Sequence, residues 1–240
     1  MHMSVFAQLG DWLAALGSGL IGSLRDFPSI MQQLSGGVLI SVEIFMLTLL
    51  FSLPLGMVIA LGRMSKHKGI RTLTKFYISI MRGTPLMLQL IVVYFGPYIL
   101  FGMPLSLEYR FYAAIIGFVL NYAAYFAEIY RSGIEAIPVG QHEAAQLLGF
   151  NRTQTFFKII LPQVIKRVLP PVTNEIITLV KDTSLAYAIS VVEMFTIAKQ
   201  LVAAESNMVP LFVAGIFYYV FNLLVAFIMG RIEKRLSYYQ

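Results

Sequence analysis

The chain alternates long apolar runs with short segments that carry most of its charge. Five runs are long enough to match the ~20 residues that an α-helix needs to cross a bilayer. They cover residues 37–61, 76–101, 112–134, 169–192 and 209–229. Hydrophobic residues make up 58% of the 240 residues and charged residues only 12%, whereas soluble domains carry about 25% charged residues. The pattern predicts an all-α polytopic membrane protein with five transmembrane helices.

The N-terminal residues 1–35 differ from the rest because polar residues and glycines interrupt their apolar character. The polar and helix-breaking positions are Asp11, Arg25, Asp26 and Pro28. We expect an interfacial helix or re-entrant arm here, followed by a transmembrane domain over residues 36–240. A sixth span within the arm is the alternative.

Basic residues concentrate in three places: the connection 63–75, the region 131–167 and the C-terminal tail. Positively charged residues gather on the cytoplasmic side of membrane proteins, so these places are predicted to be cytoplasmic. Five spans then put the N-terminus outside and the C-terminus inside. The net charge of +6 is explained by this topology, and no nucleic-acid partner is expected.

Residues 138–162 form a polar interruption between the third and fourth runs. Pro138 suits the first turn of a helix, and Gly149 suits the position just past a helix end. The helix between them is too short to cross a bilayer and lies in the cytoplasm under the predicted topology. A glutamate followed by two alanines makes a compact knob on it that can dock in a groove of another protein. The alternative is an ordinary amphipathic hairpin joining two spans.

The residue spacing in this segment resembles the EAA loop of the permease subunits of ATP-binding-cassette (ABC) importers. The matching positions are Glu143, Ala144, Ala145, Gly149, Ile159, Leu161 and Pro162. The resemblance implies that Glu143, Ala144, Ala145 and Gly149 couple the chain to a cytoplasmic ATPase subunit.

The chain has no sequence motif for binding a nucleotide or for catalysis. The GxxxxGK[ST] loop that holds ATP phosphates does not occur, and HExxH, GxSxG and histidine clusters are missing as well. With no cysteine, thiolate metal sites are excluded. We therefore expect no catalytic residue, metal site or cofactor on this chain, with ATP and Mg²⁺ bound by the partner ATPase.

Two polar stripes lie within the apolar runs. At about 100° per residue, one stripe occupies one face of the fourth run, and the third run carries another at spacing i, i+4, i+7. The first consists of Asn174, Glu175, Thr178, Lys181 and Asp182, and the second of Asn121, Tyr125 and Glu128. Charges at this depth are costly and normally face a cavity or a partner. We expect a water-filled path that suits a zwitterion. Alternatively, the charges neutralise one another and only hold helices together.

Arg82, Gly83, Thr84 and Pro85 interrupt the second run. Gly83 and Pro85 weaken a helix, and Thr84 can hydrogen-bond to backbone groups that the interruption frees. We interpret the segment as a kink in the gate region, with Arg82 reaching towards the cytoplasmic face or pairing with Glu128. A plain helix bend is the alternative.

Residues 76–86 and 174–185 are similar to the polar amino acid branch of these permeases, and residues 181–185 are most similar to its cystine-type members. The resemblance implies a type I importer fold with five spans in a bacterial cytoplasmic membrane. It also implies an ATPase dimer, a second permease chain, identical as a first expectation, and an extracellular or periplasmic binding protein. ATP hydrolysis would then drive amino acid import by alternating access. An ion-coupled carrier or channel for small polar solutes is the alternative function.

Overall fold

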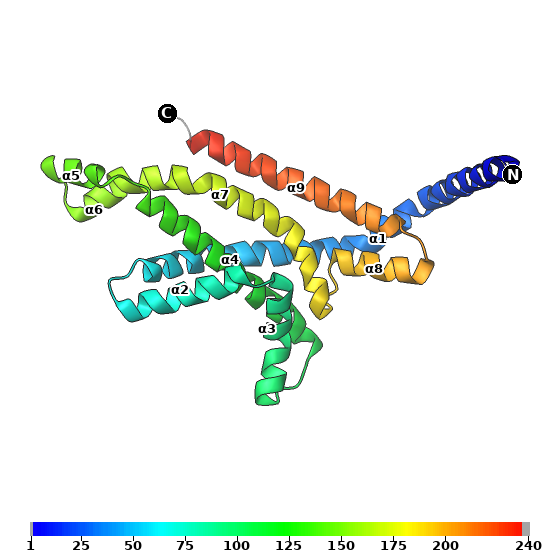
Figure 1. The fold of residues 1–240 in the computed structure, drawn as a ribbon, viewed down its shortest axis with the longest axis horizontal. Coiled ribbons are helices and arrows are strands. Elements are labelled where there is room, and N and C mark those ends of the chain that lie inside the picture. Colours follow the sequence, from blue (N-terminus) through cyan, green and yellow to red (C-terminus); the bar gives the residue numbers. More distant parts are fainter. Residues whose placement is uncertain (1, 237–240) are drawn as a thin grey trace.

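The computed structural model describes the backbone of residues 2–236 and the side chains of residues 27–236. Helices joined by short connections make up this part of the chain (Figure 1). The elements are α1 (His2–Arg63), α2 (Lys68–Gly83), α3 (Leu86–Phe101), α4 (Leu107–Glu135), α5 (Val139–Leu147), α6 (Arg152–Gln154), the π-helix η1 (Thr155–Ile160), α7 (Leu161–Asp182), the 3₁₀-helix η2 (Thr183–Ile189), α8 (Met194–Glu205) and α9 (Val209–Leu236).

Three helices of the described chain are long and apolar enough to cross a membrane by themselves: residues Phe27–Arg63 of α1, α4 and α9. Two further candidates are bent helix pairs. Helices α2 and α3 meet at 112°, and the segment Arg152–Ile189 meets α8 at 56°. When each bent pair is taken as one crossing, the total is five, which agrees with the predicted all-α membrane fold.

The predicted span boundaries are wrong in three places. The first apolar helix begins before residue 37, because α1 continues through Pro28 without a break. The second run, expected as one span, is the two helices α2 and α3. The fourth run stops being an α-helix at Asp182 and continues as η2, with the separate helix α8 beyond it. Apolar length predicts where chain can lie in a membrane, but it does not reveal a change of helix direction.

The interfacial arm predicted for residues 1–35 lies largely outside the side chains that the structure describes. Residues 27–35 belong to the same helix as the first span. In this segment Ile30 and Leu34 pack in a buried cluster with Met194 of α8 and Val213 of α9. The division of the chain at residue 35 therefore stays a prediction.

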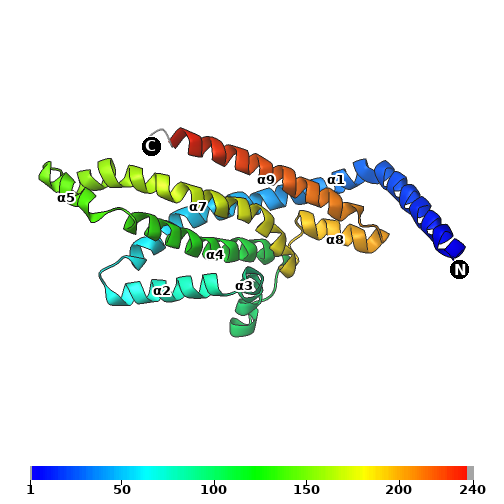
Figure 2. The same cartoon turned by 45° about the horizontal axis from the view of Figure 1, so that its top comes forward.

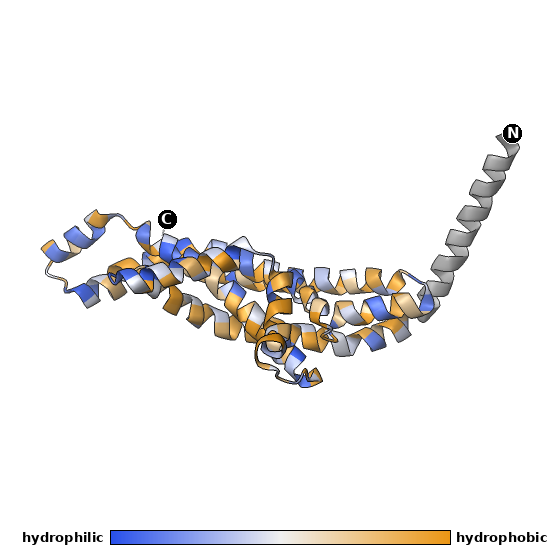
Figure 3. Cartoon of the chain, turned by 60° about the horizontal axis from the view of Figure 1, so that its bottom comes forward, coloured by the Kyte–Doolittle hydropathy of each residue, from blue (hydrophilic) through white to orange (hydrophobic). Residues whose placement is uncertain are grey.

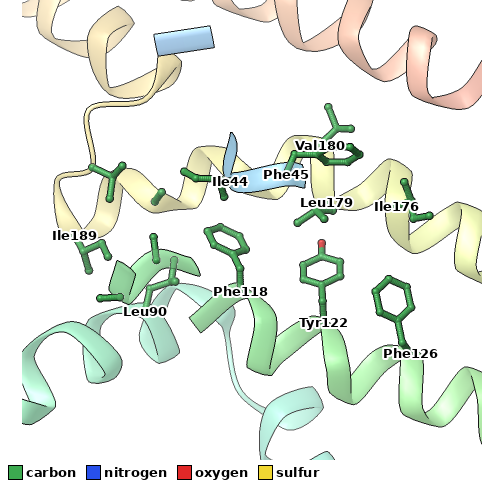
Figure 4. Close-up of a cluster of buried hydrophobic side chains, with 14 of the residues drawn as sticks. Ile44, Phe45, Leu90, Phe118, Tyr122, Phe126, Ile176, Leu179, Val180 and Ile189 are labelled. Atoms are coloured by element: carbon green, nitrogen blue, oxygen red, sulfur yellow. The ribbon is translucent and has the colours of Figure 1, made fainter. Parts of the chain in front are cut away.

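Helix α4 lies at the centre of the bundle. Phe118, Tyr122 and Phe126 are buried along one side of it and point towards residues of α1 and α7, including Leu179 (Figure 4). On α1, Gly56 permits close approach, since a Cβ atom there would lie only 2.8 Å from Cβ of Phe126. This packing fixes the two helices that carry the predicted polar stripes, α4 and α7, against each other.

The two ends of the molecule have different characters. Helices α5 and α6 project from the bundle at one end, and α8 lies towards the other end (Figure 2). Hydrophilic residues are frequent in the projecting end, while the bundle is mostly hydrophobic (Figure 3). The projecting end is the one that the basic residues predict to be cytoplasmic.

Candidate functional site

The predicted knob is the nine-residue helix α5, which Pro138 precedes and which ends at Leu147. Gly149 follows with a φ of 81°, a left-handed conformation that favours glycine. Its N–H donates to the carbonyl of Gln146 (3.0 Å), and Phe150 N–H donates to the carbonyl of Ala145 (3.0 Å). These bonds satisfy carbonyl groups that the helix end would leave free, so the predicted role of Gly149 as a helix end is confirmed.

The side chains of α5 divide into an inner and an outer set. Ala145 is buried and faces its own chain, whereas Glu143 and Ala144 are exposed. Leu147, at the end of the helix, is 89% exposed. A large exposed apolar side chain beside a carboxylate at a water-facing position favours contact with another protein.

Helix α5 is connected to α7 through a short, well-defined segment. Asn151 and Gln154 form a reciprocal capping box at the start of α6, with bonds of 3.0 and 2.9 Å. The π-helix η1 then leads directly into α7, where Arg167 donates to the carbonyl of Ala136 at 2.7 Å. Ile137, Ile160 and Val164 form a buried apolar cluster in this region. A displacement of α5 would therefore reach both α4 and α7.

The predicted kink is a complete break between α2 and α3. Thr84 is extended, and its hydroxyl donates to the carbonyl of Ile80 at 2.9 Å, as the sequence predicts. The side-chain amide of Gln89 donates to the carbonyl of Met81 (2.9 Å) and to the Thr84 hydroxyl (2.8 Å). From α4, Asn121 donates to the same Met81 carbonyl (3.1 Å) and to the Gln89 side-chain oxygen (2.9 Å). Two amide side chains thus satisfy the backbone that the break exposes.

The other two members of the α4 stripe contact arginines. The guanidinium of Arg82 lies over the ring of Tyr125, 5.2 Å from its centroid, a cation–π contact. Glu128 forms an ion pair with Arg131, which also pairs with Glu135. Arg82 interacts electrostatically with Glu128, but the ion pair of Glu128 is with Arg131. The direct pairing of Arg82 with Glu128, one of the two expectations for this arginine, is therefore wrong.

The α7 stripe has an exposed part and a half-buried part. Asn174, Thr178 and Lys181 are exposed at spacing i, i+4, i+7, and the Thr178 hydroxyl donates to the Asn174 carbonyl at 2.9 Å. Glu175 and Asp182 are half-buried. Neither carboxylate forms an ion pair with Lys181, so the neutralising pairs that the sequence allows are not formed among the described residues.

The half-buried carboxylates connect α7 to neighbouring helices. The hydroxyl of Tyr122 on α4 donates to Asp182 Oδ2 at 2.8 Å. Glu175 interacts electrostatically with Arg82 of α2. The structure therefore brings the gate segment and both stripes into one polar region between α2, α4 and α7.

Three polar residues of the structure were missed by the sequence reasoning. Tyr122 and Gln89 lie within apolar runs, and Gln89 gave one usable signal, a lone amide close to a predicted kink. The third is Glu193, whose fully buried carboxylate (0% exposed) accepts bonds from the N–H groups of Phe195 (2.8 Å) and Thr196 (2.7 Å). The Tyr218 hydroxyl of α9 donates to it as well (2.9 Å). Glu193 thereby begins α8 and attaches it to α9.

No cluster of three or more metal-ligating side chains occurs among the residues that the structure describes. The polar region between α2, α4 and α7 holds carboxylates, amides, hydroxyls and cations. Such a set can bind and release a charged solute.

Comparison with known proteins gives a consistent result. Residues 52–238 match the family described as binding-protein-dependent transport system inner membrane component. The chain is 37% identical over 216 residues to the arginine transport system permease protein ArtQ of Bacillus subtilis (strain 168), which covers 88% of this chain and 97% of ArtQ. It is 36% identical over 213 residues to the L-cystine transport system permease protein TcyB of the same organism, covering 88% and 89%.

A solved structure agrees with these relatives. A chain from the crystal structure of an amino acid ABC transporter with histidines superposes with a TM-score of 0.80 at 29% identity, covering 88% of this chain and 97% of that chain. The resemblance to ABC importer permeases drawn from residues 143–162 is therefore confirmed. The protein is a multi-pass, non-catalytic permease of the inner membrane whose partner ATPase binds ATP, and it belongs to the family of binding-protein-dependent transport system inner membrane components.

Proposed function

We propose that this permease imports a polar amino acid, with cystine as the first candidate, along a path lined by the exposed polar face of α7. The observation that carries the proposal is the exposed polar face of α7, formed by Asn174, Thr178 and Lys181. Such a face is costly in contact with lipid and normally lies against a cavity or a partner. A water-filled path removes that cost.

The charges beside this face match the two ends of an amino acid. Lys181 can bind a carboxylate, while Glu175 and Asp182 can bind an ammonium group. On α4, the partly exposed Tyr125 and Glu128 lie beside this face in the proposal, and the buried Asn121 supports the gate segment from the same stripe. Cystine carries two ammonium groups and two carboxylates, so it can bind Lys181 and the carboxylates of Glu175 and Asp182 at the same time. The relatives named for arginine and cystine transport support a polar amino acid, and the similarity of residues 181–185 to cystine-type members favours cystine.

We infer that the second permease chain is an identical copy. The exposed polar face of α7 needs a facing surface to enclose the path, and a second copy would supply the same face by two-fold symmetry. In this arrangement the two α5 helices each contact one ATPase subunit through Glu143 and Ala144, with Ala145 and Gly149 shaping the helix. ATP-driven closure of the ATPases would draw the α5 helices together, and the break at Arg82–Pro85 would allow the gate to move.

Reconstitution with the ATPase subunit and binding protein tests the coupling. We expect ATP turnover to rise only with the binding protein loaded with its amino acid, and cystine to exceed arginine and glutamine. Glu143→Lys should reduce this stimulation about tenfold or more, since losing a charge contact at a protein interface costs about 2 kcal/mol or more. Thr72→Lys, at an exposed position of α2, is the control and should leave it unchanged. Equal turnover in assembled Glu143→Lys complexes would refute the coupling role.

Uptake by a Lys181→Met variant tests the path separately. We expect uptake to fall at least about tenfold, because an unpaired substrate carboxylate in the path costs more than 1.4 kcal/mol, while ATP turnover without substrate stays at the wild-type level. Lys199→Met, which removes a lysine that lies over the ring of Tyr187 (4.3 Å), is the matched control. Unchanged affinity and uptake for Lys181→Met would refute the role of this lysine.

A further inference from the structure

A pocket outside the polar path lies between the C-terminal half of α9 and the first turns of α7. Its volume is about 360 Å³, and Lys166, Glu233 and Lys234 contribute its charged groups. The pocket shares no residue with the coupling helix, the gate segment or the stripes. The basic residues of the chain predict that this end of both helices is cytoplasmic.

Apolar residues also line the pocket. Leu169 and Pro170 of α7 and Leu236 of α9 line it. Gly230 also lines it, and a Cβ atom there would meet nothing within 4 Å, so the glycine adds no side chain to the open space. The lining of the pocket therefore combines two lysines with apolar side chains, which suits an amphipathic ligand.

The positive charge extends beyond the lining residues. Arg231 and Arg235 of α9 are exposed, and the Arg231 guanidinium lies 4.7 Å from the ring centroid of Phe227. Cations in the last turns of a helix also interact favourably with its dipole. Glu233 is the one carboxylate that lines the pocket. Positive side chains therefore gather at this end of α7 and α9 and attract anions.

An apolar stripe runs along α9 directly away from this pocket. Ile216, Val220, Leu223 and Phe227 are exposed and lie on one face, at i, i+4, i+7 and i+11. The same face continues at Gly230 and reaches Lys234, a lining residue of the pocket. A ligand with a charged head in the pocket and long apolar chains could therefore lie along a single surface.

We propose that the pocket between α7 and α9 binds the phosphodiester headgroup of an anionic phospholipid of the inner leaflet, with its acyl chains along the α9 stripe. Lysines at the cytoplasmic membrane surface attract anionic lipids, and basic pockets between membrane helices bind their headgroups. A soluble phosphate would satisfy the cations but would leave the apolar stripe unused. The chemistry of the whole surface thus matches a lipid better than a free anion.

The assembled transporter in lipid nanodiscs provides the test. Nanodiscs of phosphatidylcholine with increasing phosphatidylglycerol are compared by thermal unfolding and by native mass spectrometry of retained lipid. We expect phosphatidylglycerol to raise the melting temperature of the wild type. Lys166→Gln or Lys234→Gln should increase the fraction of phosphatidylglycerol needed for half of the effect about fivefold each. Lys68→Gln and Lys75→Gln, exposed lysines of α2, are matched controls and should behave as wild type.

Three outcomes would overturn the proposal. Equal phosphatidylglycerol dependence in all variants would show that the pocket is not a lipid site. Equal stabilisation by inorganic phosphate, without added anionic lipid, would mean that a soluble anion suffices. Loss of the ATPase from the pocket variants in pure phosphatidylcholine would assign the surface to a protein contact. Because each variant is first measured in phosphatidylcholine, a folding defect is separated from a lipid effect.

Discussion

The two bent crossings are broken by different means. Between α2 and α3, the sequence itself marks the break with Gly83 and Pro85, and the amides of Gln89 and Asn121 satisfy the freed backbone. Between η2 and α8, residues 183–194 contain neither glycine nor proline. At this second break, the buried carboxylate of Glu193 accepts the N–H groups at the start of α8 and the Tyr218 hydroxyl of α9. A helix break in a membrane protein can thus be encoded by local residues or by contacts between distant helices.

The largest expected effect comes from Glu193, because its carboxylate receives several hydrogen bonds in a buried site. Glu193→Gln should lower the free energy of unfolding by roughly 3 kcal/mol, since an amide cannot accept all of these bonds and leaves buried donors unsatisfied. Chemical denaturation of the purified protein in detergent measures the loss. Glu205→Gln, at the exposed end of the same helix, is the control. A change below about 0.5 kcal/mol for Glu193→Gln would mean that the second break does not depend on this residue.

An intermediate effect is expected at the first break, where two amides share one carbonyl. Gln89→Leu and Asn121→Leu should each cost about 1 kcal/mol of unfolding free energy, in the range of hydrogen bonds between membrane helices. Because the two side chains are bonded to each other at 2.9 Å, the double variant should lose less than the sum of the two. A double-mutant cycle in detergent measures this coupling. Strict additivity would show that the amides act independently.

The smallest effect is expected at Ser190, which has a φ of 59° at the end of η2. Ser190→Gly should change the unfolding free energy by no more than about 0.5 kcal/mol, because relief of the left-handed conformation is offset by the greater freedom of glycine in the unfolded chain. Ser184→Gly, at a helical position in the same segment, should be destabilising by about 1 kcal/mol. The pair is compared in one denaturation series. Equal losses would contradict the assignment of strain to Ser190.

The sequence predictions succeeded where local residues determine the structure and failed where contacts between distant helices determine it. The ends of α5 could be predicted because Pro138 and Gly149 act through their own backbone preferences. The candidate membrane segments could be located from apolar length, and the break at Thr84 from adjacent glycine and proline. Each of these signals is local to the residues that produce the structure.

The features that could not be predicted depend on which helices meet. From the sequence alone, Tyr122 is expected to be an apolar core residue. In the structure, its hydroxyl group donates a hydrogen bond to Asp182 of α7. Glu193 lies near the end of an apolar run, and only its contact with α9 shows why a carboxylate is tolerated there. The sequence left two hypotheses for Lys181: an ion pair with a neighbouring carboxylate, or a place along a water-filled path. The packing of α7 leaves its side chain exposed. These contacts cannot be predicted from one sequence, because they join residues that lie far apart along the chain.

The π-helix η1 has a geometric consequence for the whole transporter. A π-turn accommodates an extra residue compared with an α-turn, and η1 lies between the coupling helix and the polar face of α7. Because each residue of an α-helix turns the chain by about 100°, deleting one residue of η1 would rotate Asn174, Thr178 and Lys181 away from their present direction while α5 stayed in place. The length of this six-residue segment therefore sets the direction in which the polar face of α7 points relative to α5, and with it the angle between the proposed solute path and the proposed ATPase contact.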